Sequence, residues 1–244
     1  GRSRGAFISI CRRRHYTVTA TLTQALSYTG FAVVAALVGG AIAIYRAPSP
    51  QMESNIQHLA AGVVFAAVAA ELLPDIHDKS PTVVVTGFAA GVVAMLAIHR
   101  LSKTIEKKGI GGTYAGAAGL LITIGIDMFI DGVLIGVTFI EAPSTGIIIA
   151  LALTIEVLFL GVAAVVALPE EMGTLRRMAV PATFGGLITV GVIVGVLTLS
   201  GASEAIIAVV LAFGAAALLY LVTEELLVKA GKVPQTMVST TLFF

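Results

Sequence analysis

Seven apolar stretches, each of roughly 18 residues or more, constrain the fold of this chain more than any other feature. A helix of that length crosses the hydrocarbon layer of a bilayer with its backbone groups hydrogen-bonded internally. A mean hydropathy of +1.00 and a charged fraction of 12% exclude an ordinary soluble domain. The sequence therefore predicts an all-α polytopic membrane protein with spans near 22–45, 53–74, 83–99, 113–140, 146–168, 179–200 and 205–228.

The two ends of the chain differ from this pattern. Residues 1–20 form a basic segment with five arginines, which we interpret as a targeting or processing segment, or as vector sequence, outside the fold. Residues 21–244 then form a single transmembrane bundle, because the linkers are too short to hold a soluble domain. After Pro234 the chain turns apolar again, and this final stretch is typical of the start of an eighth span.

The charges in the loops predict how the bundle is oriented. Nine lysines and arginines follow the odd-numbered spans, whereas Lys79 is the only cation that follows an even-numbered one. By the positive-inside rule the N-terminus lies outside, and we expect the plasma membrane as the location. The alternative is that the arginines of residues 1–20 mark a cytoplasmic N-terminus, which would invert every loop.

No motif in the sequence indicates catalysis. The chain contains one cysteine, Cys11, no P-loop, and no serine, histidine and aspartate set at helix positions that could meet. We therefore expect no enzyme activity and no nucleic-acid partner. Membrane lipid is the partner that the composition itself implies.

Two aspartates interrupt the apolar stretch GIDMFIDGVLIG of the fourth span. Asp127 and Asp131 are one helical turn apart, so their side chains project from the same face. Two carboxylates that close in a low-dielectric medium cannot both stay ionised without a cation or a proton between them. Thr123 and Thr138 extend the same polar stripe, which predicts that it faces a polar cavity or another helix.

Glu156 is the only charged residue near the middle of the fifth span. Counting about 1.5 Å per residue from the loop between the two spans places Glu156 within roughly a turn of the depth of Asp127. Asp127, Asp131 and Glu156 then converge and form a candidate metal site, whose oxygen ligands suit hard divalent cations such as Mn²⁺, Mg²⁺ or Ca²⁺. The residues leave two other roles open: protonated side chains that serve packing, and a proton relay.

Several segments resemble the Zrt/Irt-like (ZIP) family of divalent metal transporters. DMFIDG at 127–132 resembles the fourth-helix motif His-Asn/Ser-x-x-Glu-Gly, and EVLFLG at 156–161 falls where the family has His/Gln-Asn/Glu-x-Pro-Glu-Gly on helix 5. AAGVVFAAVAAELLPD and AFGAAALLYLVTEELL resemble the second and seventh helices. The resemblance implies a ZIP-like fold, homodimerisation and transport of a divalent metal such as Zn²⁺, Mn²⁺, Fe²⁺ or Cd²⁺.

The motif residues depart from the family pattern and reduce the site. Carried over by position, the same three acids form the first metal site, while Leu160 replaces the glutamate that bridges two metals. The second site is lost, because Met128 and Val157 replace its ligands. The resemblance therefore implies one carboxylate site, which selects Zn²⁺ over harder ions less strongly than a site with imidazole does.

Two alternatives to a divalent-metal transporter stay open. A ZIP-like scaffold could serve regulation or assembly without transport, and the replaced ligands favour it. A carrier of another solute could use the carboxylates for proton coupling.

Polar residues near the ends of spans are expected to be solvated, although each could lie on an ion pathway. His58 and His99 lie at one side of the second and third spans, and Glu224 and Glu225 at the same side of the seventh. The opposite side carries a cluster that could form an entry funnel, with Glu71, Asp75, His77 and Asp78.

Two further patterns concern the packing of the spans. Gly132/Gly136 and Gly191/Gly195 are Gly-xxx-Gly pairs, which let helix backbones approach closely in lipid. AAELLPD ends the second span and LVTEELL ends the seventh, on helices of opposite direction, which is the pattern of an inverted repeat.

Overall fold

The computed structural model describes the backbone of residues 2–108, 115–234 and 237–244, and the side chains of these residues except 2–17, 106, 115 and 116. The described residues form long helices and short connections, and none of them is in a strand. Seven helical runs among them are long and apolar enough to cross a membrane, as the sequence predicted. These runs are Val18–Tyr45, Pro50–His77, Pro81–Ile105, Ala117–Glu141, Pro143–Val166, Thr174–Leu199 and Glu204–Ala230.

The spans correspond to helices with few interruptions. The first span lies within α1 (Arg2–Tyr45), and the third to sixth spans lie within α4 (Pro81–Lys107), α5 (Ala115–Glu141), α6 (Pro143–Val166) and α7 (Thr174–Leu199). The second span consists of α2 (Pro50–Ala67), η1 (Val68–Leu72) and α3 (Leu73–His77). The seventh consists of α8 (Glu204–Tyr220), η3 (Leu221–Leu226) and α9 (Leu227–Ala230), and α10 (Met237–Phe243) follows.

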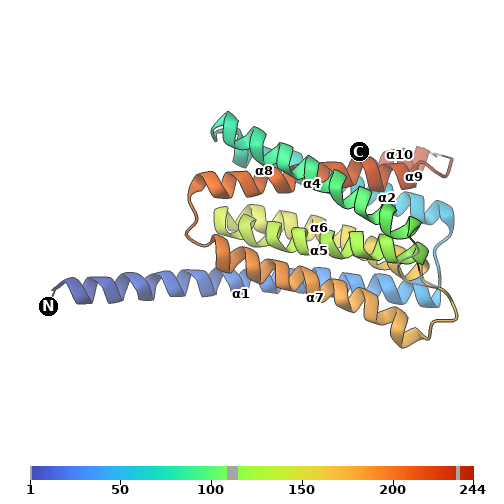
Figure 1. Cartoon of the computed structure of the whole chain (residues 1–244), viewed down its shortest axis with the longest axis horizontal. Helices are drawn as coiled ribbons and strands as arrows, with labels where there is room; N and C mark the ends of the chain where they lie inside the picture. The colour runs from blue at the N-terminus through green and yellow to red at the C-terminus, as the bar shows by residue number, and fades with distance from the viewer. Residues whose placement is uncertain (1, 109–114, 235–236) are drawn as a thin grey trace.

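The bundle has α5 and α6 at its centre (Figure 1). On one side α1 packs against α6 and α7, and α7 packs along α5. On the other side α4 and α8 pack together, α4 and α8 contact α5, and α2 contacts α6. Two groups of helices therefore enclose the α5–α6 pair, and many residues of these two helices are buried.

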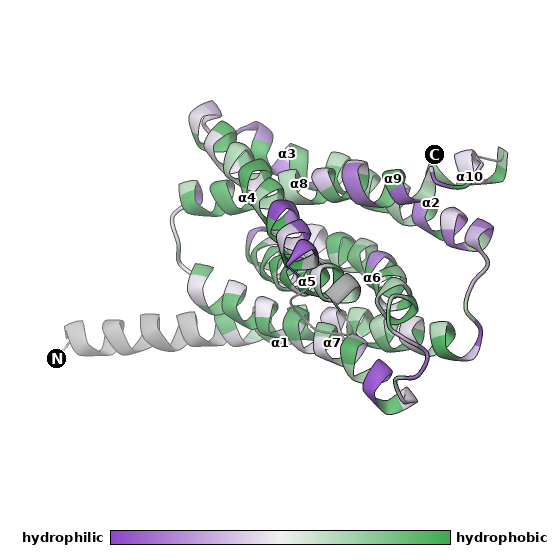
Figure 2. Cartoon of the chain, turned by 45° about the vertical axis from the view of Figure 1, so that its right-hand side comes forward, coloured by the Kyte–Doolittle hydropathy of each residue, from purple (hydrophilic) through white to green (hydrophobic). Residues whose placement is uncertain are grey.

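Hydrophilic residues occur mainly near helix ends and in connections, and the bodies of the long helices are mostly apolar (Figure 2). The last residues of α1, α4, α6 and α9 lie at one end of the bundle, which we call the basic end because most of the loop cations follow these helix ends. Lys79 lies at the opposite end, which we call the Lys79 end. Seven apolar spans with polar ends make the chain an integral membrane protein.

Proline and serine fix where several spans begin. Pro50, Pro81 and Pro143 each occupy the first position of a helix, where the missing N–H costs no hydrogen bond. Ser49 caps α2 by accepting a hydrogen bond from the Met52 N–H at 3.3 Å, and Ser203 caps α8 in the same way. Short connections with defined helix starts set the register between neighbouring antiparallel spans.

The Gly-xxx-Gly pairs of α5 and α7 pack against each other. A Cβ atom added to Gly132 would lie 2.9 Å from the Cα of Gly191, and one added to Gly136 would lie 2.9 Å from the Val192 carbonyl oxygen. Such distances leave no room for a side chain, so glycine is required for this approach. The contact holds α5 in a fixed rotation about its axis, which determines the direction in which its aspartates point.

Both segments with the inverted-repeat pattern contain π-helical turns. VAAEL forms η1 within the second span and LVTEEL forms η3 within the seventh, and each is followed by a short α-helical end. Each π segment packs against the main helix of the other span, η1 on α8 and η3 on α2. The similarity of the two sequences therefore corresponds to a similarity of backbone shape, and π-bulges of this kind are frequent at functional sites.

Two helical segments lie outside the seven spans, the first part of α1 and the helix α10. α1 begins at Arg2, so residues 2–20 of the basic segment and the first span share one helix, whose first turns project beyond the other helices (Figure 1). At the other end α10 packs along α2, and a Cβ atom added to Gly62 would lie 2.9 Å from the Phe243 carbonyl carbon. At seven residues α10 is too short to cross a bilayer.

Candidate functional site

The three acids predicted from the sequence meet at the centre of the bundle. Asp127 and Asp131 project from α5, and Glu156 projects from α6. One carboxylate oxygen from each can be chosen so that all three lie within 4.8 Å of one another. We call these three residues the carboxylate cluster. The predicted agreement in depth between Asp127 and Glu156 is therefore confirmed.

The carboxylate cluster is almost completely removed from solvent. Asp127 is 6% exposed, Asp131 is 1% exposed and Glu156 is fully buried. Each lies near the middle of its helix, about 15 Å or more from the helix ends at 1.5 Å per residue. Acids at this depth are costly in a membrane protein and mark functional positions.

Three oxygen atoms of the cluster accept no hydrogen bond from any residue that the structure describes: Oδ2 of Asp131 and both Oε atoms of Glu156. An ionised carboxylate without a partner costs several kcal/mol in such a site. Something that supplies positive charge or protons must therefore accompany these groups. Two ligand oxygens on opposite sides of a cation lie about 4–5 Å apart at common metal–oxygen distances, so the spacing within the cluster fits one divalent ion.

The polar stripe of α5 is buried as predicted. Thr123 and Thr138 are 8% and 0% exposed. Their hydroxyls donate hydrogen bonds to carbonyl oxygens of their own helix, to Gly119 at 3.0 Å and to Ile135 at 2.9 Å. Both hydroxyl hydrogens are used within α5, so the threonines do not supply protons to the cluster.

Met128, Val157 and Leu160, which stand where the resemblance would require further metal ligands, belong to the apolar core. Met128 and Val157 are fully buried, and Leu160 is 1% exposed. All three belong to the main hydrophobic cluster of the bundle. Met128 therefore contributes to packing. Glu156 belongs to the carboxylate cluster, together with Asp127 and Asp131.

Glu225 is more buried than the sequence analysis expected. It lies in η3, its side chain is 16% exposed, and it forms an ion pair with Lys229 at 3.3 Å. Glu224, its neighbour, is exposed. The expectation of solvation is therefore right for Glu224 and wrong for Glu225. A signal was present in the i,i+4 spacing of Glu225 and Lys229, but the spacing alone does not show which face of the helix is buried.

His58 is also more buried than expected for a residue near the end of a span. It is 4% exposed, and its Nδ1 lies 2.8 Å from the carbonyl oxygen of Ser54. Ser54 in turn donates a hydrogen bond to the carbonyl oxygen of Ala230 at 2.9 Å. The prediction of a solvated His58 is wrong because α2 packs against α9 at this level.

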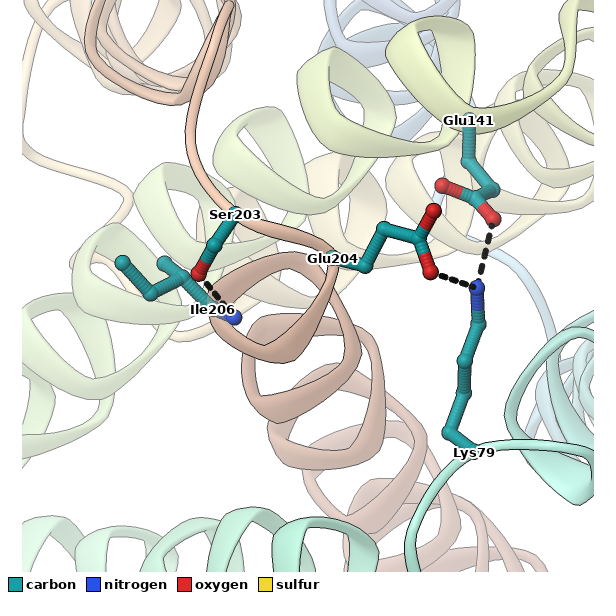
Figure 3. Close-up of polar contacts among 5 residues, drawn as sticks. All are labelled: Lys79, Glu141, Ser203, Glu204 and Ile206. Atoms are coloured by element: carbon teal, nitrogen blue, oxygen red, sulfur yellow. Dashed lines mark hydrogen bonds and ion pairs between the residues drawn. The ribbon is translucent and has the colours of Figure 1, made fainter.

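The Lys79 end holds a second meeting of acids from different helices (Figure 3). The Nζ atom of Lys79 lies 3.3 Å from Glu141 Oε1 and 3.9 Å from Glu204 Oε2. Glu141 ends α5 and Glu204 begins α8, so this Lys79 bridge joins two helices through the connection before α4. The sequence analysis did not identify it, since no spacing rule relates the three positions.

The predicted entry funnel is only partly assembled. Glu71 lies in η1 and accepts a hydrogen bond from Thr145 of α6 at 3.3 Å. His77 and Asp78 are exposed, whereas Asp75 is half-buried. Among the described residues, only the carboxylate cluster brings three potential metal ligands of the His, Cys, Asp and Glu types within reach of one ion.

Compared with known proteins, the chain matches no family model and no curated protein sequence. The interpretation of the site therefore depends on its own geometry and chemistry.

Proposed function

We propose that this protein is a membrane transporter of divalent metal cations, which binds its cargo at Asp127, Asp131 and Glu156. The observation that carries the proposal is the burial of three carboxylates around one point, with oxygen atoms of Asp131 and Glu156 that no described residue partners. A divalent cation supplies both the positive charge and the ligand bonds that these oxygens lack.

The place of the cluster in the bundle supports transport over a structural role for the ion. A structural metal can sit anywhere in a fold, whereas transporters hold their cargo near the middle of the membrane, between groups of helices that move relative to each other. The carboxylate cluster lies at mid-length of α5 and α6, with one group of helices on each side. Three carboxylates and one divalent ion leave at most a single net negative charge, which one proton can balance.

The resemblance to the ZIP family supports the same function. The positions that carry the resemblance on helices 4 and 5 are those that contribute the carboxylate cluster. We accordingly propose a ZIP-like fold with one metal site and no enzyme activity. Oxygen ligands alone favour harder ions, so Mn²⁺ is the preferred first probe, with Zn²⁺, Fe²⁺ and Cd²⁺ as competitors.

The proposed orientation follows from the loop charges. The basic end would face the cytoplasm and the Lys79 end the outside, with the N-terminus outside and the plasma membrane as the location. A homodimer is the assembly that the resemblance implies. Crosslinking of the protein in native membranes tests that expectation independently of transport.

Metal flux into sealed vesicles tests the function directly. The purified protein is reconstituted into liposomes loaded with a metal-sensitive dye, and Mn²⁺ is added outside. We expect flux with the unaltered protein and loss of nearly all flux with Asp131→Asn, because one of three ligands then loses its charge. Glu141→Gln is the matched control, since it removes a carboxylate of the same helix outside the site.

The same vesicles separate the alternatives. Equal Mn²⁺ flux in the unaltered and Asp131→Asn proteins would overturn the proposal. Absence of metal flux together with proton movement driven by another solute would favour the proton-coupled carrier. Absence of both, in protein that is folded and correctly inserted, would favour a scaffold without transport.

A further inference from the structure

A cavity of about 840 Å³ opens at the basic end, between the last turns of α1 and the start of α2. The two helices leave this space because different neighbours hold them. Ala43, near the end of α1, belongs to a small apolar cluster with Val162 and Val165 of α6. Ser54 of α2 instead donates a hydrogen bond to the carbonyl oxygen of Ala230 in α9. The volume falls within the range of about 300–1,000 Å³ that is typical of small-molecule sites.

The inner wall of this cavity is apolar. Val38 and Ile42 of α1 and Met52 of α2 line it, and all three side chains are exposed in the protein itself. Val38 lies seven residues before the last residue of α1, which is about 10 Å further from the basic end at 1.5 Å per residue. The wall therefore extends from the end of the bundle into its apolar part, as a hydrocarbon chain of a lipid does.

The mouth of the cavity is polar and carries a positive charge. Tyr45, Arg46 and Ser49 line it, and none of the described residues that line the cavity is acidic. Arg46 is exposed and forms no ion pair with a described residue. The Ser49 hydroxyl accepts a hydrogen bond from the Met52 N–H, and its own hydrogen is donated to no described residue. A guanidinium and a hydroxyl are thus free to bind an anionic group such as a phosphate.

We propose that this cavity binds one anionic phospholipid, with the headgroup phosphate at Arg46 and Ser49 and an acyl chain along Val38 and Ile42. Basic pockets between membrane helices bind anionic lipid headgroups. The planar guanidinium of Arg46 presents a fork of N–H donors that matches the geometry of a phosphate. The bound lipid would contact α1 and α2, which belong to different groups of helices, at the end of the bundle. The proposal does not depend on metal transport.

A second groove near the basic end provides a contrast. It lies between α4 and the seventh span and has a volume of about 540 Å³. Its polar lining residues include His99, Tyr220 and Glu224, and Glu224 is exposed. The carboxylate of Glu224 repels a phosphate, so this groove should not select an anionic lipid. Because each lining contains one tyrosine, Tyr45 and Tyr220 are matched positions for a reporter group.

Tryptophan quenching by brominated lipids tests the proposal. The chain contains no tryptophan, so Tyr45→Trp and Tyr220→Trp each introduce a single fluorophore. Each full-length variant is reconstituted into bilayers of phosphatidylcholine and phosphatidylglycerol in which one of the two lipids is brominated. At Tyr45→Trp we expect about a fivefold preference for phosphatidylglycerol, the effect of one basic side chain at a membrane surface. Tyr220→Trp should show no preference. An equal preference at both positions would reflect the charge of the whole basic end and would overturn the proposal.

Removal of the cation identifies its role. In the Tyr45→Trp background, Arg46→Gln should abolish the preference for phosphatidylglycerol. Arg176→Gln should retain it, because Arg176 is an exposed arginine of the same end that does not line this cavity. Circular dichroism confirms that each variant is folded, which is expected because both arginines are exposed. An unchanged preference in Arg46→Gln would contradict the assignment of the headgroup to Arg46.

Competition in detergent distinguishes a lipid from a free anion. Brominated phosphatidylglycerol bound to Tyr45→Trp is displaced by unbrominated phosphatidylglycerol or by inorganic phosphate at the same concentration. We expect the lipid to displace it and phosphate to have little effect, because the acyl chain contributes to binding. Ile42→Ser should weaken lipid binding, since it makes the apolar wall polar. Equal displacement by phosphate, or unchanged binding in Ile42→Ser, would show that the cavity does not hold an acyl chain.

Discussion

Acidic side chains from different helices meet at two places in this bundle. In the centre, Asp127, Asp131 and Glu156 lie around one point and leave three oxygens without a hydrogen-bond partner in the described structure. At the Lys79 end, Glu141 and Glu204 share the ammonium of Lys79 (Figure 3). Carboxylate oxygens thus lack a partner among the described residues in the centre, whereas a lysine neutralises the carboxylates at the Lys79 end.

The difference distinguishes a candidate ligand-binding site in the centre from a structural ion pair at the Lys79 end. A partly exposed ion pair is satisfied within the protein and has little need of a ligand. A buried set of carboxylates is satisfied only when a cation or protons arrive. Exposure explains the contrast, because Lys79 reaches water at the end of the bundle, whereas the cluster is enclosed by α5, α6 and the helices around them.

Matched substitutions in the two regions should give the largest difference. Glu156→Gln should abolish the stabilisation of the protein by Mn²⁺, which for a ligand at 100 times its Kd is about 2.7 kcal/mol. Glu141→Gln, the same change in the Lys79 bridge, should leave that stabilisation intact. Thermal unfolding with and without Mn²⁺ measures both. Equal stabilisation of the two variants would remove the distinction between the regions.

Lowering the pH should weaken metal binding in the centre. Protons compete with the metal for carboxylates, so the affinity for Mn²⁺ should fall as pH falls, by up to about tenfold per pH unit for each proton that the ion displaces. Calorimetric titration of Mn²⁺ between pH 8 and pH 6 measures the slope. Glu141→Gln should show the slope of the unaltered protein, and a pH-independent affinity would mean that no proton leaves when the ion binds.

In the metal-free protein, the carboxylate cluster should destabilise the folded state. Asp131→Asn replaces a carboxylate whose Oδ2 accepts no hydrogen bond from a described residue by a neutral group of similar size, so it should raise the free energy of unfolding by about 1 kcal/mol or more. Thermal unfolding in the presence of a chelator measures this change. A lower midpoint in Asp131→Asn would mean that the carboxylate is already well satisfied in the metal-free protein.

The Lys79 bridge should show the smallest effect. Lys79→Met should lower the free energy of unfolding by about 0.2–1 kcal/mol, as expected for a partly exposed ion pair. The loss should shrink at high ionic strength, because salt screens exposed charges. Thermal unfolding at two salt concentrations measures it. A decrease in the free energy of unfolding well above about 1 kcal/mol would show that the bridge stabilises the packing of the helices more than a partly exposed ion pair does.

Particular residues show how much of the structure could be predicted from the sequence. Seven spans, the depth of Glu156 relative to Asp127, and the close packing at Gly132 and Gly191 were predicted, because each depends on period, length or local spacing. The burial of His58 and of the Glu225 side chain was not predicted. Both depend on how α2 and the seventh span pack at the basic end, and spacing within one helix carries no information about the helix that faces it.

The sequence by itself determined that the chain is a bundle of membrane-spanning helices and that three acids lie at one depth within it. It did so because apolar length and the 1.5 Å rise of a helix are local properties. Only the tertiary structure decided that one oxygen of each of the three acids lies within 4.8 Å of the others, and that Glu141 and Glu204 share Lys79. These facts depend on the rotation and neighbours of each helix, which packing between distant segments sets.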